Sequence, residues 1–213
     1  MSARRPVKIP DSAIRRLSFY HRHLRNLRSL GVETISSREI AAAYGLEPFQ
    51  VRKDLSYFGS FGRRGRGYSV RKLQQRLEHI LGLDNKWRMA LVGAGNIGMA
   101  VFRYGEYRRQ GFEIVAVFDA DPSKIGRKLE YGITVQPIER IATAVAESQI
   151  DIAIVAVPPE AAQHVVDLLA AAGIRAILSF PGGQMLVPKD VALRRVSLEA
   201  DLQALSYFLA NKQ

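Results

Sequence analysis

A run of glycines between two apolar segments constrains the fold of this chain most strongly. The segment Met89–Val92 is typical of a short strand, and it leads into the pattern GxGxxG, after which Met99–Tyr104 can continue as a helix. A second apolar segment, Glu113–Phe118, ends in Asp119, 21 positions after the last glycine. Strand, glycine loop, helix, strand and acid in this order are typical of a dinucleotide-binding βαβ unit. A glycine turn followed by an incidental aspartate is the alternative.

Each residue type in this unit suits one part of a dinucleotide. The glycines permit a tight turn and a close approach to the pyrophosphate, and the start of the helix offers N–H donors and positive potential. A carboxylate at Asp119 can accept both ribose hydroxyls of an adenosine and would repel the 2′-phosphate of NADP(H), so NADH and NAD⁺ are the expected cofactors. The loop residues expected to bind the cofactor are Gly93, Ala94, Gly95, Asn96, Ile97 and Gly98.

The alternation of strand and helix continues toward the C-terminus. Apolar, β-branched segments at Ile150–Val157 and Ile174–Phe180 flank an alanine-rich helical segment, Glu160–Ala172. This pattern predicts the α/β class, with a Rossmann-type parallel sheet covered on both faces. Ligands of such sheets bind at the carboxyl ends of the strands. The residues expected there, as walls of a nicotinamide pocket, are Val157, Pro158 and Phe180. Proline-bearing turns would explain these residues equally well.

Charge is distributed very unevenly along the chain. Residues 1–86 hold 18 lysines and arginines against 7 acidic residues, whereas residues 87–213 hold 13 of each, so the first part carries the whole net charge of +11. A solvated basic face explains the sign but not the partition, and a polyanion is the expected partner of the first part. The chain has no cysteine, no apolar stretch long enough to cross a bilayer and no signal-peptide pattern, so a cytoplasmic protein without a membrane partner is expected.

Three helices are predicted in the basic part. For the first helix, an apolar pattern at helical spacing follows Pro10, with Asp11 or Ser12 as the N-cap and Gly31 at the C-cap. A capping box, Ser36-Ser37-Arg38-Glu39, then opens a short helix that Gly45 closes, and Pro48 suits the first turn of the next helix. Two short helices joined by a glycine turn form a helix-turn-helix, whose second helix lies in the major groove of DNA.

The second helix of this pair carries polar and basic residues that can contact DNA. Glutamine and arginine can bind base edges in bidentate fashion, and lysine supplies a point charge. The expected DNA contacts from this helix are Gln50, Arg52, Lys53 and Ser56. Phe49, Val51 and Leu55 are expected to face the core. An ordinary amphipathic helix with a basic face is the alternative.

A glycine- and arginine-rich segment, residues 58–70, follows the helix-turn-helix. It suits a β-hairpin tip, or wing, that inserts arginine into the minor groove, although a flexible loop has the same composition. The expected wing contacts are Arg63, Arg64, Arg66 and Tyr68. A fourth helix with Val70, Leu73, Leu77 and Ile80 on one face would complete an N-terminal winged-helix domain.

The last segment carries a seam of leucines at helical spacing. Leu198, Leu202, Leu205 and Leu209 follow one another in steps of 4, 3 and 4 residues. Such a stripe must be buried, either on the chain's own domain or, as a helix exchanged in a homodimer, on a second copy. The expected organisation is a DNA-binding domain at 1–82, an NAD(H)-binding domain at 83–190 and a C-terminal strand and helix for dimer contact at 191–213.

Several ordered motifs resemble the Rex family of redox-sensing transcriptional repressors over nearly the whole chain. The matching segments are Lys8-Ile9-Pro10, residues 49–59 (FQVRKDLSYFG), Gly65-Arg66-Gly67-Tyr68, residues 79–83 (HILGL), the glycine motif and residues 118–122 (FDADP). The resemblance implies a homodimer with a winged helix, a Rossmann domain that senses the NADH/NAD⁺ ratio, an exchanged C-terminal helix, and release from pseudo-palindromic operator DNA by NADH.

The resemblance also implies a network that responds to the nicotinamide. Arg22 and Tyr104 match an arginine of the first helix and a tyrosine after the glycine-motif helix, and Tyr104 is also expected near the cofactor. The aspartate that completes the network in the family falls on Ser197, so the chain departs there, and Glu199 or Asp201 would be its substitute. The family's Asn-Phe at a strand end is Ser179-Phe180 here.

The absence of catalytic machinery favours a sensor over an enzyme. A dehydrogenase needs a proton donor and a substrate domain, yet the C-terminal part holds one histidine, His164, expected at the surface or in packing. We therefore expect neither catalytic residues nor a metal site. A small NAD-dependent oxidoreductase with a basic appendage, and a DNA-binding regulator that senses a coenzyme A derivative, remain as alternatives.

Overall fold

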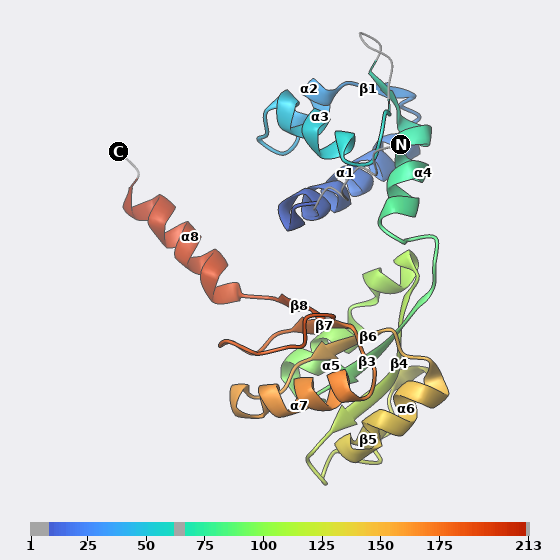
Figure 1. The fold of residues 1–213 in the computed structure, drawn as a ribbon, viewed down its shortest axis with the longest axis vertical. Helices are drawn as coiled ribbons and strands as arrows, with labels where there is room; N and C mark the ends of the chain where they lie inside the picture. The colour runs from blue at the N-terminus through green and yellow to red at the C-terminus, as the bar shows by residue number, and fades with distance from the viewer. Residues whose placement is uncertain (1–8, 62–66, 212–213) are drawn as a thin grey trace, which may run out of the picture. The chain divides into compact units, whose positions relative to one another are not determined.

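The computed structural model describes residues 9–61 and 67–211, which form two compact units (Figure 1). The first unit comprises residues 1–85 and the second residues 86–213. Each unit has its own hydrophobic core.

The N-terminal unit is a small helical bundle with one two-stranded sheet. Its elements are α1 (Asp11–Ser29), β1 (Thr34–Ile35), α2 (Ser37–Ala42), α3 (Pro48–Ser56), β2 (Tyr68–Ser69) and α4 (Val70–Ile80). The core residues come from every helix and include Leu17, Tyr20, Leu24, Ile40, Val51, Leu55, Leu73 and Leu77. This apolar face of each helix holds α1, α3 and α4 together, as the helical periodicity predicts.

Local sequence signals set most helix ends in this unit. Ser36 and Glu39 form the predicted capping box, and Pro48 occupies the first turn of α3. The prediction of Asp11 or Ser12 as N-cap is wrong, because the extended residue before α1 is Pro10. Proline's φ of −65° suits this extended position as well as the helix, so the helix begins one residue earlier than the side-chain caps indicated.

The wing segment pairs with a strand that lies far from it in sequence. Tyr68 pairs with Ile35 and Ser69 with Thr34 in antiparallel register, so the described partner of β2 is β1 rather than a neighbouring strand of a hairpin. Gly67 makes this pairing possible, because its φ is +69° and a Cβ there would lie 2.6 Å from the carbonyl oxygen of Ile35. Residues 62–66, including the predicted Arg63, Arg64 and Arg66, lie outside the described residues.

The second unit is built on a six-stranded parallel sheet of order β5-β4-β3-β6-β7-β8. Its strands are β3 (Trp87–Val92), β4 (Phe112–Asp119), β5 (Val135–Pro137), β6 (Ile152–Val155), β7 (Ala176–Ser179) and β8 (Ala192–Arg195). Its helices are α5 (Asn96–Arg103), α6 (Ile141–Ser148), α7 (Pro159–Ala171) and α8 (Leu198–Ala210), with 3₁₀ turns η1 (Gly105–Gln110), η2 (Glu130–Gly132) and η3 (Ile138–Arg140). The α/β parallel-sheet prediction is confirmed.

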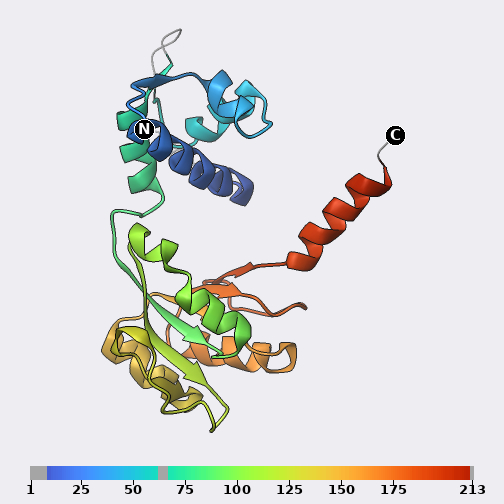
Figure 2. The same ribbon diagram turned by 180° about the vertical axis from the view of Figure 1, so that it is seen from behind.

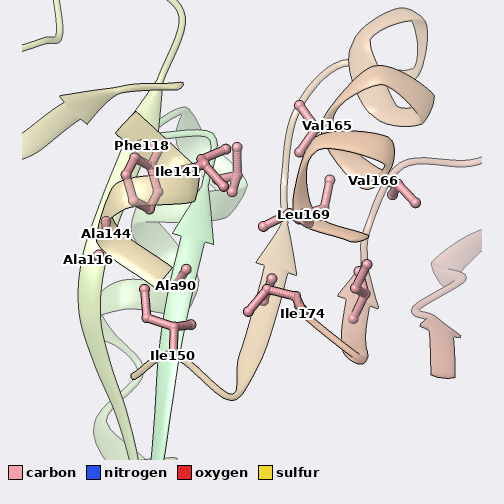
Figure 3. Close-up of a cluster of buried hydrophobic side chains, with 14 of the residues drawn as sticks. Ala90, Ala116, Phe118, Ile141, Ala144, Ile150, Val165, Val166, Leu169 and Ile174 are labelled. Carbon is pink, nitrogen blue, oxygen red and sulfur yellow. The ribbon is translucent and has the colours of Figure 1, made fainter. Parts of the chain in front are cut away.

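Helices cover both faces of this sheet. On one face, Ala90 and Phe118 of the strands pack against Ile141 of α6 and Val165 and Leu169 of α7 (Figure 3). The other face packs against α5, which lies in front of the sheet in Figure 2. Successive strand residues therefore serve opposite cores, which explains why the central strands are apolar throughout.

The C-terminal helix α8 is different from the other helices. Ser197 caps its start by accepting the backbone N–H of Ala200 at 3.2 Å. All thirteen residues of α8 lie within the described part of the chain, and none of them is buried. The leucine seam is thus exposed in the single chain and does not pack on its own domain, with exposed fractions of 56% for Leu202 and 60% for Leu205.

Candidate functional site

The glycine loop joins β3 to α5, and its glycines meet three different steric demands. Gly93 has a φ of +103°, and a Cβ there would lie 2.4 Å from the carbonyl oxygen of Ala156. A Cβ on Gly98 would lie 1.8 Å from the carbonyl oxygen of Gly93, so the start of α5 can approach the loop only with glycine at this position. A Cβ on Gly95 would meet nothing within 4 Å, which leaves open space at the N-terminus of α5 for an anionic group.

A cavity of about 940 Å³ opens beside this loop, at the carboxyl ends of the strands. Eight of the predicted cofactor residues line it: Gly93, Gly95, Asn96, Ile97, Asp119, Val157, Pro158 and Phe180. Ala94 and Gly98 are buried in the loop and at the start of α5 and are not among the lining residues. The walls predicted from strand ends and the loop predicted from the glycine pattern therefore belong to one cavity.

Asp119 connects the end of β4 to the glycine loop. Its Oδ2 accepts the N–H of Ala94 at 2.7 Å, and its Oδ1 accepts the N–H of Asp121 at 2.9 Å. Lys124 donates to Oδ2 at 3.2 Å. A carboxylate offers about four acceptor positions. Three are occupied here, so the arrangement leaves room for one further donor such as a ribose hydroxyl, and for a second if Lys124 moves.

Lys124 and His164 also line this cavity, and neither was predicted as a cofactor contact. Lys124 follows Asp119 within one loop, and its hydrogen bond to Asp119 raises the pKa of the lysine above its ordinary value. His164, expected at the surface or in packing, lines the cavity from α7. The only sequence signal for Lys124 is that a lysine lies five residues after Asp119. Whether its side chain can contact Asp119 depends on the conformation of the loop between them.

Tyr104 lies at the other end of α5 from the glycine loop. The eight residues of α5 span about 12 Å, and Tyr104 caps their C-terminal end with 64% of its surface exposed. It lines a second cavity, of about 620 Å³, whose walls are almost entirely apolar. Phe180 lines both cavities. Within a single chain, Tyr104 is therefore next to the cofactor cavity but not part of its lining.

Three of the four predicted DNA-contacting residues of α3 share an exposed face. Arg52, Lys53 and Ser56 are exposed, and Arg52 donates a hydrogen bond to the hydroxyl of Ser37 at 3.2 Å. Tyr68, in β2, is half-buried, and burial raises the pKa of its hydroxyl. Arg52 and Lys53 thus lie at the surface of the basic unit, where a polyanion can bind them.

Gln50 takes part in a buried network instead of lying free on this face. Asp54 of α3 is fully buried, and its carboxylate accepts two hydrogen bonds from Arg16 of α1, at 2.6 and 2.8 Å. Tyr20 donates to it at 2.9 Å and Gln50 at 2.7 Å. Burial alone would raise the pKa of Asp54, but these hydrogen bonds outweigh burial and hold the pKa below its ordinary value. The network fixes α3 on α1.

The structure corrects the prediction that Phe49 faces the core. Val51 and Leu55 are buried as predicted, but 64% of the surface of Phe49 is exposed. Asp54 completes the buried face of α3, next to Val51 and Leu55. Phe49 lies on the opposite side of the helix, so the third core residue is a charged one instead of the predicted phenylalanine.

Comparison with known proteins identifies the family of the chain. Residues 8–56 match the family described as "Putative DNA-binding protein N-terminus", and residues 84–183 match "CoA binding domain". The redox-sensing transcriptional repressor Rex of Chloroflexus aurantiacus is 48% identical over 204 residues, which cover 96% of each chain. The Rex of Syntrophomonas wolfei is 47% identical over 203 residues, covering 95% of this chain and 96% of the relative. The chain belongs to the Rex family of redox-sensing transcriptional repressors.

Solved structures of a Rex-family repressor, RSP, share the fold. RSP in complex with β-NAD⁺ and operator DNA has a TM-score of 0.89 and 39% identity, covering 94% of this chain and 92% of its own. RSP in complex with β-NADH has a TM-score of 0.86 and 37% identity, covering 95% of each chain. The predicted Rex organisation, an N-terminal DNA-binding domain followed by a Rossmann-like domain, is confirmed.

The positions that the Rex resemblance assigns to a switch lie on separate elements. Arg22 is exposed on α1, with its guanidinium 5.8 Å from the centre of the Phe19 ring. Ser197, which the resemblance places at the family's aspartate position, is the N-cap of α8. Serine and aspartate are both good N-caps, so the start of α8 does not depend on a carboxylate at this position.

The described residues contain neither a cluster of metal ligands nor a membrane-spanning helix. Within residues 9–61 and 67–211, no group of three or more potential metal ligands is present. None of the described helices of this Rex chain is long and apolar enough to span a bilayer.

Proposed function

We propose that this protein represses transcription by binding operator DNA when NADH is scarce, and that NADH bound in the glycine-loop cavity releases it. One observation carries this proposal. A single chain joins a basic unit with an exposed cationic face on α3 to a sheet whose glycine loop and Asp119 form one side of a large cavity. The relatives are named redox-sensing transcriptional repressors, and the similar RSP structures are complexes with β-NAD⁺ and operator DNA and with β-NADH.

The chemistry of the cavity supports one orientation of the cofactor in this proposal. The pyrophosphate lies at the N-terminus of α5 next to Gly95, and the adenosine ribose lies at Asp119. The nicotinamide lies toward Val157, Pro158 and Phe180, and Tyr104 and Arg22 respond to it. The chain has no part in hydride transfer, so the cofactor acts as a signal.

The operator is bound by a homodimer that exchanges α8. Two observations support this: the leucine seam of α8 is exposed, and the cavity beside Tyr104 is apolar and open. A two-fold dimer presents two copies of α3 to a pseudo-palindromic operator in the cytoplasm, with Gln50, Arg52, Lys53, Ser56 and Tyr68, and the wing arginines Arg63, Arg64 and Arg66, as DNA contacts.

A coenzyme A derivative is the second candidate ligand, because residues 84–183 match a coenzyme A-binding family. Coenzyme A carries a 3′-phosphate on the ribose, and the carboxylate of Asp119 would repel it. Lys124 offsets only part of this repulsion, because it is already hydrogen-bonded to Asp119. Thermal-shift titrations with NADH, NAD⁺ and coenzyme A separate the two ligands, and stabilisation by coenzyme A alone would contradict the proposal.

Asp119→Ala tests the cofactor site. We expect NADH and NAD⁺ to bind about 10- to 150-fold more weakly, and by the same factor, because hydrogen bonds to a charged acceptor contribute about 1.5–3 kcal/mol and both forms share the ribose. Calorimetric titration measures both affinities. Asp121→Ala is the matched control, because Asp121 lines the same cavity but its side chain bonds to Ser123. Normal binding by the Asp119 variant would place the ribose elsewhere.

A further inference from the structure

The exposed face of α3 contains one large apolar ring. Phe49, Arg52, Lys53 and Ser56 are spaced at i, i+3, i+4 and i+7, which puts them on one side of the helix. All four are exposed. An arginine, a lysine and a serine on this face suit a polyanion, but a phenylalanine does not interact with phosphates.

The ring cannot turn inward without rotating the whole helix. Val51 and Leu55 anchor the opposite face in the core, and the Asp54 network ties that face to α1 through Arg16 and Tyr20. Phe49 therefore stays exposed because the packing and the buried hydrogen bonds of α3 both specify the same rotation.

Phe49 also lacks the aromatic contacts that shelter another exposed phenylalanine of this unit. Phe19 stacks on Tyr44, with ring centres 5.8 Å apart, and lies beneath Arg22. Among the described residues, no ring pair or cation–π contact includes Phe49. An exposed, unstacked ring on a functional surface marks a contact with something outside the chain.

The surroundings of the ring indicate the chemistry of that contact. Phe49 borders a hollow of about 560 Å³ whose charged walls are two arginines, Arg38 and Arg52, and one acid, Glu47, so positive charge prevails. The occupant must carry negative charge beside a small apolar group. In the major groove of DNA, the apolar group on the base edges is the C5-methyl of thymine, and phenylalanine is one of the side chains that contact it.

We propose that Phe49 is a specificity-determining residue that packs on a thymine methyl of the operator. The inference rests on the proposed function, since it assumes that α3 enters the major groove. Arg52 and Lys53 bind the polar edges and phosphates nearby, while Phe49 distinguishes thymine from cytosine by the methyl group alone.

The test removes the methyl group from the DNA, because deoxyuridine is thymidine without the C5-methyl. The wild-type protein first selects its operator from a randomised palindromic library, and each thymine of a half-site is then replaced, one at a time and in both half-sites, by deoxyuridine. We expect one thymine at which the wild type loses about fourfold in affinity per half-site, the value of one buried methyl group. The Phe49→Ala variant should bind the unmodified operator more weakly than the wild type does. Replacing that thymine by deoxyuridine should cause no further loss of its affinity.

The matched control is Lys53→Ala, which should lose affinity on all sequences but keep the response to the missing methyl. Circular dichroism checks that the Phe49→Ala variant is folded. We expect it to fold, because the Phe49 side chain is exposed. The inference is overturned if the wild type is insensitive to deoxyuridine at every thymine, or if Phe49→Ala keeps the full response. If the wild type selects no operator at all, the proposed function fails together with this inference.

Discussion

Replacing Leu202 or Leu205 by aspartate should separate the dimer and abolish operator binding while each chain remains folded. Both leucines are more than half exposed in the single chain, so the substitution removes no internal contact. In a dimer that exchanges α8, burial of each leucine stabilises the interface by about 1.5–3 kcal/mol, and two-fold symmetry makes each contact occur twice. An aspartate at the same position loses this stabilisation and also costs the free energy of removing a charge from water.

Operator binding depends on the dimer because two half-sites must be held about one helical turn apart. A monomer keeps one copy of α3 and binds with the weak affinity of nonspecific contacts. Analytical ultracentrifugation and operator-binding titrations measure the two effects. Gln203→Asp is the control, because it adds the same charge to α8 outside the leucine seam. An intact dimer for both leucine variants would contradict the exchanged-helix account.

Gly98→Ala should produce a repressor that binds its operator but ignores NADH. The new Cβ would lie 1.8 Å from the carbonyl oxygen of Gly93, so the loop or the start of α5 must move. Moving the N–H donors at the start of α5 weakens their hydrogen bonds to the charged pyrophosphate, each of which contributes about 1.5–3 kcal/mol. Both NADH and NAD⁺ should therefore bind about 10- to 150-fold more weakly. The N-terminal unit has its own core, so operator binding should persist.

Gly105→Ala is the matched control for this prediction. It makes the same change at a glycine where a Cβ would meet nothing within 4 Å. Calorimetry with NADH and fluorescence anisotropy with labelled operator measure the two activities of each variant. Normal NADH release of the Gly98 variant would show that the cofactor does not depend on this loop.

The sequence predicts one side of the glycine-loop cavity because the residues on that side follow one another along the chain. The glycine loop and Asp119 belong to one βαβ unit, whose geometry is nearly invariant once the strands are parallel. Lys124 was not predicted, because its contact depends on the path of an irregular loop. The strand β5 and helix α6 were not predicted either, since three strand residues and a short alanine-rich helix leave too weak a periodicity.

The error at Phe49 has a specific physical origin. Hydrophobicity alone assigns Phe49, Val51 and Leu55 to the core and Asp54 to the surface. The helical spacing places Phe49 with Arg52 and Ser56, on the side of α3 away from Val51 and Leu55, so hydrophobicity alone assigns the ring to the wrong side. Arg16 and Tyr20 of α1 neutralise and hydrogen-bond Asp54, so its carboxylate can be buried beside the apolar residues. The sequence of α3 alone does not contain those partners.

The leucine seam shows a different limit. Its spacing predicts a buried stripe, and the single chain leaves that stripe exposed. The surface that covers it belongs, in our account, to a second copy, which a single sequence does not specify.

The central claim is that NADH binding and operator binding oppose each other, and titrating NADH into the dimer with and without saturating operator tests it most directly. Thermodynamic linkage requires operator to weaken NADH binding by the same factor by which NADH weakens operator binding. For a coupling of about 1–3 kcal/mol, the NADH dissociation constant should rise about 5- to 150-fold when operator is present. An equal NADH affinity in both titrations, with the operator still bound, would contradict the redox-sensing account.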